Sequence, residues 1–411
     1  MTTDDDDAEL DAGFVVLATG SLSSAALPDL PGLDSFDGPV LHTGRWPHGP
    51  VDVTGRRVGV IGTGSSGIQA IPVLAEQAGH LTVFQRTAAY VVPAGNRPLT
   101  AEEVAEVKAD YPAFRAANSL MTLGFGSRRP ASDTPALAVD EDERRRVFEE
   151  RWQRGGLSFL GSFADLLVDT GANAAAAGFV RSKIAETVHD ADVAARLMPD
   201  TLIGCKRLCV ASDYYATFNR PDVELVDVSA TPIEAVTPGG VRVGDRQVDL
   251  DVLVCATGFD AMTGSVLRID IRGRGGVTLA EAWAEGPGTY LGLQVARFPN
   301  LFLVNGPGSP SVLSNMVVSI EHHVGWIAEC IGWVRDRGLA TIEAEPDAQR
   351  TWVRYVNDVA SFTLFPTCNS WYLGANVPGK PRVFMPLIGF PPYVEQCAEV
   401  VADGYRGFTK A

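Results

Sequence analysis

Glycine occupies the first, third and sixth positions of a six-residue turn, Gly62-Thr63-Gly64-Ser65-Ser66-Gly67. An apolar run typical of a strand precedes this turn, and apolar residues at helical spacing follow it. In this context Gly62 permits a tight turn, Gly64 lets the backbone approach a pyrophosphate, and Gly67 allows the helix to pack closely on the strand. Free N–H groups at the helix start favour phosphate. The pattern predicts dinucleotide binding, with a chance glycine turn as the alternative.

The end of the second strand of this βαβ unit indicates which dinucleotide binds. An NAD site places an acidic residue there to bind the ribose 2′-hydroxyl, whereas this chain has Arg86 followed by Thr87. A cation suits the additional 2′-phosphate of NADP. The sequence therefore favours NADP over NAD and over FAD at this position. The alternative interpretation of Arg86 is an exposed arginine without a ligand.

Two adjacent cations, Lys206 and Arg207, stand in an otherwise apolar segment at 204–210. Burial of an unpaired charge is costly, so such a pair needs an anionic partner. A carboxylate, a cofactor phosphate or a reaction anion would each serve. The residues alone leave two interpretations open: a binding or catalytic site, or an ion pair that only stabilises the fold.

A further segment at 36–47 lies between an Ala-Thr-Gly strand end and the glycine turn. Taken alone, His42 and Trp46 would more often be packing residues at a domain junction. The segment resembles the FxGxxxHxxxW fingerprint of the Baeyer–Villiger monooxygenases, with Phe36, Gly38, His42 and Trp46 at the matching positions. The resemblance continues through nearly the whole chain, at 62–69, 85–87, 205–207, 256–260, 306–311, 370–376 and 378–382.

The resemblance implies an enzyme in which NADPH reduces FAD and the reduced flavin uses O2 to insert one oxygen atom next to the carbonyl of a ketone. The product is an ester or a lactone. By the same resemblance Arg207 lies beside the flavin and stabilises the oxygenated flavin and the following oxyanion, a role that suits a permanently charged side chain. Arg86, Thr87 and Lys206 are implied to hold the 2′-phosphate of NADP.

Other cofactor positions follow from the resemblance. Trp371 is implied to lie on a mobile loop, around 368–382, that closes over the bound nicotinamide cofactor. Met316 matches a position beside flavin and substrate, with ordinary core packing as the alternative. We expect Ser309 to cap the helix that carries Met316, with Pro310 at its first position. The implied NADP contacts at the turn are Gly62, Thr63, Gly64, Ser65, Ser66, Gly67 and Gln69.

Composition and charge exclude several other functions. The 411 residues are 46% hydrophobic and 20% charged, as in a folded chain of two or three domains. A net charge of −16 argues against nucleic-acid and anionic-membrane partners. No apolar run reaches membrane-spanning length, and the acidic N-terminus is unlike a secretory signal. The six scattered cysteines form no CxxC motif, so we expect no metal site and a reducing, cytoplasmic compartment.

The expected fold is α/β, with a Rossmann-like NADP domain and an incomplete FAD domain. We predict that 1–46 is a remnant of the FAD domain and a linker. Residues 47–255 would form the NADP domain, with strands at 223–228, 233–236, 240–243 and 250–255. A helical insertion at about 100–200 would consist of charged helices at 101–108, 140–154, 159–169 and 176–197. Residues 256–411 would complete the FAD domain.

Two similar runs, 9–20 and 247–258, each end in Ala-Thr-Gly, but a βαβ unit precedes only the second run. Members of the family that the chain resembles begin with an FAD-binding βαβ unit, so we expect an open strand edge at 14–17. We also expect poor NADPH binding and hardly any FAD binding. The sequence leaves two alternatives to a Baeyer–Villiger enzyme. One is another flavin monooxygenase that acts on nitrogen or sulfur, and the other is an inactive NADP-binding fragment. The sequence identifies neither the ketone nor the oligomeric state.

Overall fold

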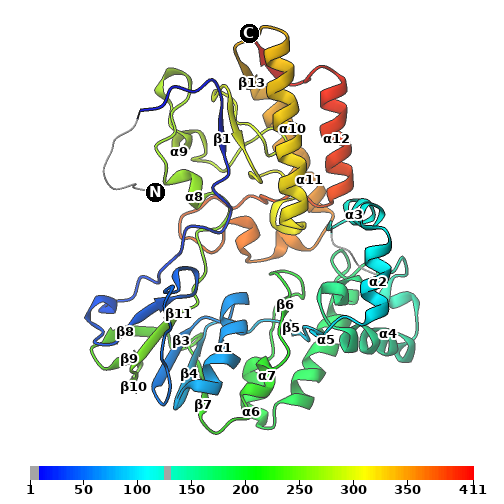
Figure 1. Cartoon of the computed structure of the whole chain (residues 1–411). Helices are drawn as coiled ribbons and strands as arrows, with labels where there is room; N and C mark the ends of the chain where they lie inside the picture. The colour runs from blue at the N-terminus through cyan, green and yellow to red at the C-terminus, as the bar shows by residue number, and fades with distance from the viewer. Residues whose placement is uncertain (1–8, 125–130) are drawn as a thin grey trace.

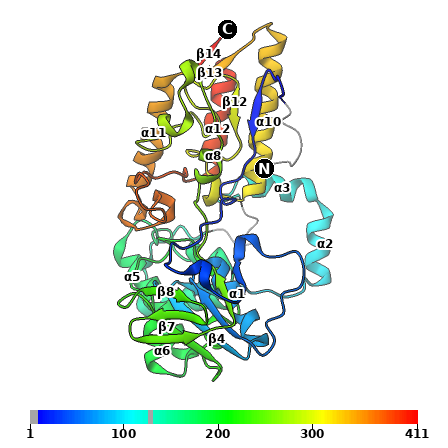
Figure 2. The ribbon, with the colours of Figure 1, turned by 90° about the vertical axis from the view of Figure 1, so that its left-hand side faces the viewer.

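The structure, a computed structural model, describes residues 9–124 and 131–411. It has two parts (Figure 1). The sheet lobe comprises the elements from β2 to β11 together with α1 and α4–α7, and the helix lobe comprises β1 and the elements from α8 to β14. Figure 2 shows the chain passing from β1 down into the sheet lobe. It returns to the helix lobe after β11.

A five-stranded parallel sheet forms the centre of the sheet lobe, in the order β2-β11-β3-β4-β7. Its central strands are continuous apolar runs with little exposed surface, because helices cover one face and a small antiparallel sheet with the 30–36 segment covers the other. The strand β2 belongs to this sheet although it precedes the glycine turn by about twenty residues. The strands are β2 (Val40–His42), β11 (Val252–Cys255), β3 (Arg57–Ile61), β4 (His80–Gln85) and β7 (Val223–Asp227).

The helix α1 (Ser65–Gln77) connects β3 to β4 and completes the βαβ unit that the sequence predicts. Ile68, Ile71 and Leu74 lie on one face of α1 and pack into the sheet core. Smaller strands flank the sheet. A three-stranded antiparallel sheet runs β10-β9-β8, and β5 pairs with β6. Their bounds are β8 (Ile233–Thr237), β9 (Gly240–Val243), β10 (Arg246–Asp249), β5 (Val91–Val92) and β6 (Cys209–Val210).

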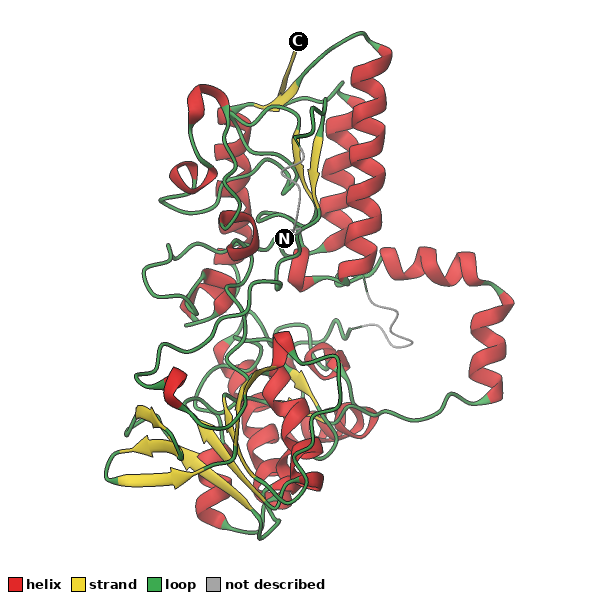
Figure 3. Ribbon diagram, turned by 60° about the vertical axis from the view of Figure 1, so that its left-hand side comes forward, coloured by secondary structure: helices red, strands yellow, loops and turns green. Residues whose placement is uncertain are grey.

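A helical insertion follows the βαβ unit. Acidic or hydroxyl side chains cap most of its helices, which is why they begin where they do. Figure 3 shows α2 and α3 as an arm that stands out from the two lobes, and Arg115 on α3 contacts Glu321 of the helix lobe at 2.8 Å. The helices are α2 (Ala101–Ala109), α3 (Tyr111–Ser119), α4 (Glu141–Arg154), α5 (Thr170–Thr187), α6 (Ala191–Leu197) and α7 (Tyr214–Thr217).

One predicted helix of the insertion, at 159–169, is wrong. The structure has a short 3-10 turn at Leu157–Gly161 and irregular turns after it. Two glycines with positive φ precede the turn. The Ser162 hydroxyl donates to the Phe159 carbonyl at 2.6 Å, so local side-chain bonding replaces helix propagation. Phe159 packs with Phe148 and Phe179 in an aromatic core, which explains the apolar pattern.

The helix lobe contains a two-stranded parallel sheet, β1 with β12, packed beside long helices. Its core is rich in aromatic side chains. No described helix is long and apolar enough to cross a membrane. The elements are β1 (Val15–Leu17), α8 (Gly264–Leu267), α9 (Leu279–Ala282), β12 (Leu301–Leu303), α10 (Met316–Asp336), β13 (Ile342–Ala344), α11 (Pro346–Ser361), α12 (Phe390–Ala402) and β14 (Phe408–Lys410).

The predicted start of the helix carrying Met316 is also wrong. A three-residue 3-10 turn follows Pro310, and extended backbone at Ser314 separates it from α10. Asn315 caps α10 by accepting from the backbone N–H of Val317 at 3.1 Å. The Ser309 hydroxyl instead donates to the Gly306 carbonyl at 2.8 Å. An amide cap at the next turn therefore replaces the expected serine cap.

Candidate functional site

The glycine turn has a different geometry at each of its three glycines. At Gly62 φ is +106°, and an added Cβ would lie 2.6 Å from the Ala256 carbonyl oxygen. A Cβ at Gly67 would lie 2.3 Å from the Gly62 carbonyl oxygen, because α1 packs directly on the turn. A Cβ at Gly64 would meet nothing within 4 Å. Gly62 and Gly67 are thus required by the fold, whereas Gly64 faces open space at the start of α1.

That open space lies at the N-terminus of α1, which begins at Ser65 with Gly64 as its cap residue and without a side-chain cap. The first N–H groups of α1 are therefore available to a ligand, and an anion such as a pyrophosphate suits them. The Thr63 hydroxyl donates to the Thr87 carbonyl at 2.9 Å and ties the turn to the end of β4. Gln69 contacts the Val210 carbonyl at 3.4 Å. The residues present fit a dinucleotide phosphate.

Three cations, Arg86, Lys206 and Arg207, have exposed side chains around this turn. The pKa of Lys206 is lowered, first by desolvation and then by the neighbouring guanidinium of Arg86, so these two cations lie close together. Among the described residues none of the three forms a salt bridge. The structure therefore gives no support to the interpretation of Lys206-Arg207 as a buried ion pair. The Asp200 carboxylate only partly offsets the lowering of the Lys206 pKa, and neighbouring cations that form no salt bridge suit a phosphate ligand.

The Lys206-Arg207 segment is also held against the glycine turn. Cys209, two residues after Arg207, has its sulfur 3.3 Å from the Ser65 hydroxyl. The Arg207 guanidinium counters the burial that raises the pKa of Cys209, and it does the same for Tyr372, whose pKa burial raises to about 12. Arg207 therefore lies between the glycine turn and the 371–373 segment.

The loop at 368–382 bridges the two lobes. Ser370 caps the 3-10 turn Trp371–Leu373, and Trp371 is half-buried with its ring 4.4 Å from that of Tyr372. Farther along the loop, the Asn376 amide donates to the Phe259 carbonyl at 2.6 Å. Lys380 forms an ion pair with Asp260 at 2.8 Å and also donates to the Ala261 carbonyl. Sequence reasoning missed these loop anchors.

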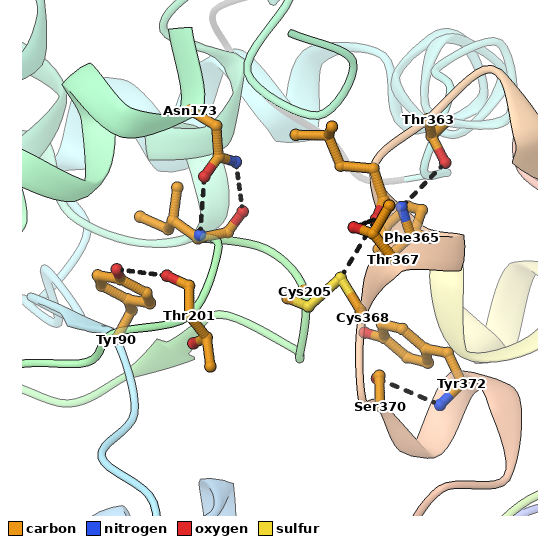
Figure 4. The surroundings of a disulfide bond; sticks show 12 residues. Tyr90, Asn173, Thr201, Cys205, Thr363, Phe365, Thr367, Cys368, Ser370 and Tyr372 are labelled. Atoms are coloured by element: carbon orange, nitrogen blue, oxygen red, sulfur yellow. Dashed lines mark hydrogen bonds between the residues drawn. A yellow bond between two sulfur atoms is a disulfide. The ribbon is translucent and has the colours of Figure 1, made fainter. Parts of the chain in front are cut away.

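A disulfide joins Cys205 of the sheet lobe to Cys368 at the start of this loop, as Figure 4 shows. The scattered cysteines led us to expect a reducing compartment, and this pair was not predicted. Cys205 and Cys368 lie 163 positions apart, so the sequence gives no local signal of their pairing. Each cysteine does adjoin a motif of the family that the chain resembles, which was the one available indication.

The fingerprint residues lie at or near the crossing between the lobes. His42 ends β2, accepts a hydrogen bond from the Gly44 N–H at 2.9 Å and packs edge-on against Phe259. Burial lowers the pKa of His42. Phe36 is buried, Trp46 remains 38% exposed, and a Cβ at Gly38 would lie 2.2 Å from the Asp251 carbonyl oxygen. His42 and Phe36 are therefore packing residues, whereas the Trp46 side chain is partly exposed.

Residues around the start of α10 form a second polar group. His323 is fully buried, accepts from the Asn305 N–H at 2.9 Å through Nδ1, and bonds the Tyr393 hydroxyl at 2.8 Å through Nε2. The Asn305 amide approaches the Met316 sulfur at 3.8 Å. Burial lowers the pKa of His323 to about 3, so this histidine is neutral. The sequence analysis did not predict this network.

Ser311 is the feature of this second group that fits a flavin. Its side chain is fully buried, and its hydroxyl has no hydrogen-bond partner among the described residues. A buried hydroxyl without a partner is costly, and a ring carbonyl of a ligand would satisfy it. Half-buried Met316 lies five residues farther along. A second GxGxxG turn for the flavin pyrophosphate does not occur in the 411 residues.

Curated proteins of similar sequence are monooxygenases. A Baeyer–Villiger monooxygenase of Pseudooceanicola batsensis is 42% identical over 405 residues, which are 97% of this chain and 73% of the relative. A cyclohexanone 1,2-monooxygenase of an Acinetobacter species is 41% identical, with the same coverage. A phenazine N-monooxygenase of Lysobacter antibioticus is also 41% identical, again over 97% of this chain and 73% of its own length. No family model matches the chain.

Solved structures agree with these relatives. An oxidized steroid monooxygenase bound to NADP is 50% identical, with a TM-score of 0.90 over 97% of this chain and 75% of that chain. A complex of OTEMO with FAD and NADP is 39% identical, with a TM-score of 0.93 and the same coverage. The predicted α/β fold with two dinucleotide-binding domains is confirmed. With such similarity along 97% of its length, the chain belongs to the Baeyer–Villiger monooxygenases, which are flavoprotein oxidoreductases.

Proposed function

We propose that this chain binds NADPH at the glycine turn and acts, with FAD, in the insertion of one oxygen atom from O2 next to the carbonyl of a small ketone. One observation carries the proposal. The glycine turn, three cations that form no salt bridge among the described residues, and the Trp371 loop lie close together between the lobes. A cytoplasmic location remains a prediction of the sequence.

Arg86 and Lys206 are proposed to hold the 2′-phosphate of NADPH. Their exposed side chains lie close enough for Arg86 to lower the pKa of Lys206, and a phosphate dianion between them would relieve this repulsion. Thr87 lies next to Arg86 at the end of β4 and is tied to the turn through Thr63. The open face at Gly64 would receive the pyrophosphate.

Arg207 is the proposed catalytic residue. Its guanidinium stays charged at any working pH, and it can hold negative charge that develops on the ketone oxygen. FAD, when bound, supplies the redox chemistry by taking a hydride from NADPH and activating O2. Ser311, whose buried hydroxyl has no partner among the described residues, would lie against the flavin ring together with Met316. Trp371 would cover the nicotinamide and exclude water.

An assay with product analysis tests this function. The purified chain is mixed with NADPH, cyclohexanone and a large excess of FAD, because the sequence predicts weak flavin retention. We expect ketone-dependent NADPH oxidation and lactone formation. Arg207→Ala should lower product formation by about 10²-fold or more, the scale for losing one oxyanion-stabilising group. Lys108→Ala, an exposed cation on α2, is the matched control.

Two outcomes would contradict the proposal. The first is NADPH binding with no lactone at saturating FAD. The second is formation of an N-oxide or a sulfoxide from test amines and sulfides by a chain that produces no ester from ketones. A visible spectrum after gel filtration tests the separate expectation of weak FAD binding, and stoichiometric flavin absorbance would show that expectation to be wrong.

A further inference from the structure

The Cys205–Cys368 disulfide lies at the junction of the two parts of the proposed NADPH site. Cys205 directly precedes Lys206, and Cys368 lies three residues before Trp371. The two Cα atoms are 5.6 Å apart, within the range that a disulfide bridges. The bond therefore joins the segment that carries the cations to the loop that would cover the nicotinamide.

The Cys205 side of the junction is firmly anchored. Asn173 on α5 is buried, and its side-chain amide forms hydrogen bonds with both the N–H and the carbonyl of Ile203, at 3.1 and 2.9 Å (Figure 4). The same amide donates to the Leu166 carbonyl at 2.8 Å. The Tyr90 hydroxyl donates to the Thr201 carbonyl at 2.7 Å. Three bonds thus fix the backbone on this side, two from α5 and one from Tyr90.

The Cys368 side has fewer ties to the sheet lobe. One backbone bond, from the Leu364 N–H to the Leu167 carbonyl at 2.8 Å, accompanies the disulfide. The hydrogen bond that Cys368 itself donates is local, from its N–H to the Phe365 carbonyl at 3.0 Å. Leu167, Leu202 and Phe365 line a small hollow beside the bond. Asn376 and Lys380 keep their bonds to residues 259–261, at the crossing between the lobes, whereas the Trp371 segment can move away from Lys206-Arg207 once the disulfide opens.

The other four cysteines differ from this pair. Cys209, Cys255, Cys330 and Cys397 are free and buried. Burial raises the pKa of Cys255 to about 11 and those of Cys330 and Cys397 to about 12, which disfavours the reactive thiolate. Cys205 and Cys368 are buried as well, but Cys205 directly precedes two exposed cations. Thiol chemistry in the described chain therefore concentrates at Cys205 and Cys368.

We propose that Cys205 and Cys368 form a reversible redox switch, in which the disulfide holds the Trp371 loop against the Lys206-Arg207 segment and the dithiol lets the loop open. The proposal concerns regulation of the NADPH site and rests on the proposed function for its effect on cofactor release. Disulfides that form in reducing compartments are generally transient and redox-sensing, which agrees with the predicted location.

Hydrogen peroxide is the oxidant that balances the reaction. The Cys205 thiolate, favoured by the adjacent cations, attacks one peroxide oxygen; an S–O bond forms, the O–O bond breaks, and the released hydroxide takes a proton to become water. The Cys368 sulfur then attacks the sulfur of Cys205. The S–S bond forms, the S–O bond breaks, and a second water leaves. The two sulfurs together lose two electrons, which the peroxide oxygens gain. A dithiol reductant reverses the reaction by exchange.

Peptide mapping tests the bond itself. The purified chain is treated with hydrogen peroxide or with dithiothreitol, denatured, alkylated and digested. We expect a cross-linked peptide pair containing Cys205 and Cys368 after peroxide, its loss after dithiothreitol, and its return on re-oxidation. Alkylation of both cysteines in the peroxide-treated sample would overturn the proposal, as would a cross-link that dithiothreitol cannot open in the folded chain.

Hydrogen exchange tests the effect on the loop. Amides at 369–382 should exchange about tenfold faster in the dithiol form than in the disulfide form, a coupling within the range typical of linked sites. Cys205→Ser and Cys368→Ser should exchange rapidly in both conditions. Cys330→Ala, a buried free cysteine on α10, is the matched control and should keep the redox response. Equal exchange in the two forms of the unmodified chain would overturn the proposal, whether or not the variants fold.

The release of NADP+ separates this inference from the proposed function. Stopped-flow displacement should show NADP+ leaving about tenfold faster from the dithiol form. If the loop responds to redox state but NADP+ binds in neither form, the switch stands and the proposed cofactor site is wrong. If NADP+ binds and leaves at the same rate in both forms, the switch does not control the site and the inference is overturned.

Discussion

The two lobes bury their strands to very different extents. In the sheet lobe, Val58, Val60 and Val254 have no exposed surface, because the five-stranded sheet is covered on both faces. In the helix lobe, β1 has one partner strand among the described residues, and Val15 and Val16 are 46% and 44% exposed. The sheet lobe contains a βαβ unit whose strands and helix follow one another in the chain, whereas the core of the helix lobe consists largely of aromatic side chains between helices. We therefore expect the stability of the sheet lobe to depend on close backbone contacts and that of the helix lobe on its buried side chains.

The largest expected effect is at the backbone contact of the sheet lobe. Gly67→Ala would place a Cβ 2.3 Å from a backbone carbonyl, so we expect a loss of about 4 kcal/mol or more in the free energy of unfolding. Gly64→Ala should leave the melting temperature unchanged, because its Cβ meets nothing, while NADPH binding weakens because the methyl occupies the phosphate space. Calorimetry and NADPH titration check both. Equal losses in the free energy of unfolding of the two variants would show that Gly64 is packed as closely as Gly67.

Acid should destabilise the helix lobe. The unfolded chain protonates His323 below about pH 6.5, whereas the folded histidine stays neutral down to about pH 3. The unfolded state thus binds more protons in this window, and stability falls as pH drops through it. We expect a loss of about 3 kcal/mol between pH 6.5 and pH 4.

Denaturant titrations followed by tryptophan fluorescence check this, since Trp326 and Trp352 lie in the same core. His323→Gln should flatten the dependence. A stability that stays constant from pH 6.5 to pH 4 would contradict the neutral, buried assignment of His323.

A substitution among the three cations Arg86, Lys206 and Arg207 should change cofactor binding without changing the stability of the fold. Lys206→Ala should weaken NADPH binding by about 1.5–3 kcal/mol, the scale of a hydrogen bond to a charged group, and leave NADH binding nearly unchanged. Lys108→Ala should change neither. Fluorescence titration with the two cofactors measures the selectivity. An equal loss for both cofactors would assign Lys206 to the pyrophosphate instead of the 2′-phosphate.

The smallest expected effects come from the same substitution, valine to threonine, made in β3 of the sheet lobe and in β1 of the helix lobe. Val60→Thr buries a hydroxyl in β3 and should cost about 1–3 kcal/mol, whereas Val16→Thr on the exposed face of β1 should cost about 0.5 kcal/mol or less. Val16→Thr should also reduce aggregation, because it makes the open strand polar. Thermal unfolding and light scattering check the pair. Similar costs at both positions would show that β1 is buried in solution.

Local patterns predicted much of the sheet lobe, whereas the site residues that they indicate stay predictions. The βαβ unit at 57–85, the strands β7, β8, β9 and β11 and most helices of the insertion follow from apolar periodicity, glycine spacing and capping residues. The same reasoning failed at 159–169 and at Ser309. In both places a short-range side-chain bond, from Ser162 and Asn315 respectively, decided the local backbone.

The sequence by itself determined the dinucleotide turn, the cation at the end of β4 and the resemblance to an oxygen-inserting flavoprotein, because these depend on residues close together in the chain. Only the tertiary structure decided that Cys205 meets Cys368, that Lys380 pairs with Asp260, and that a neutral His323 joins Asn305 to Tyr393. Such contacts join residues that can be far apart in the chain. Spacing carries no information about them, since they form when packing of the lobes brings the side chains together.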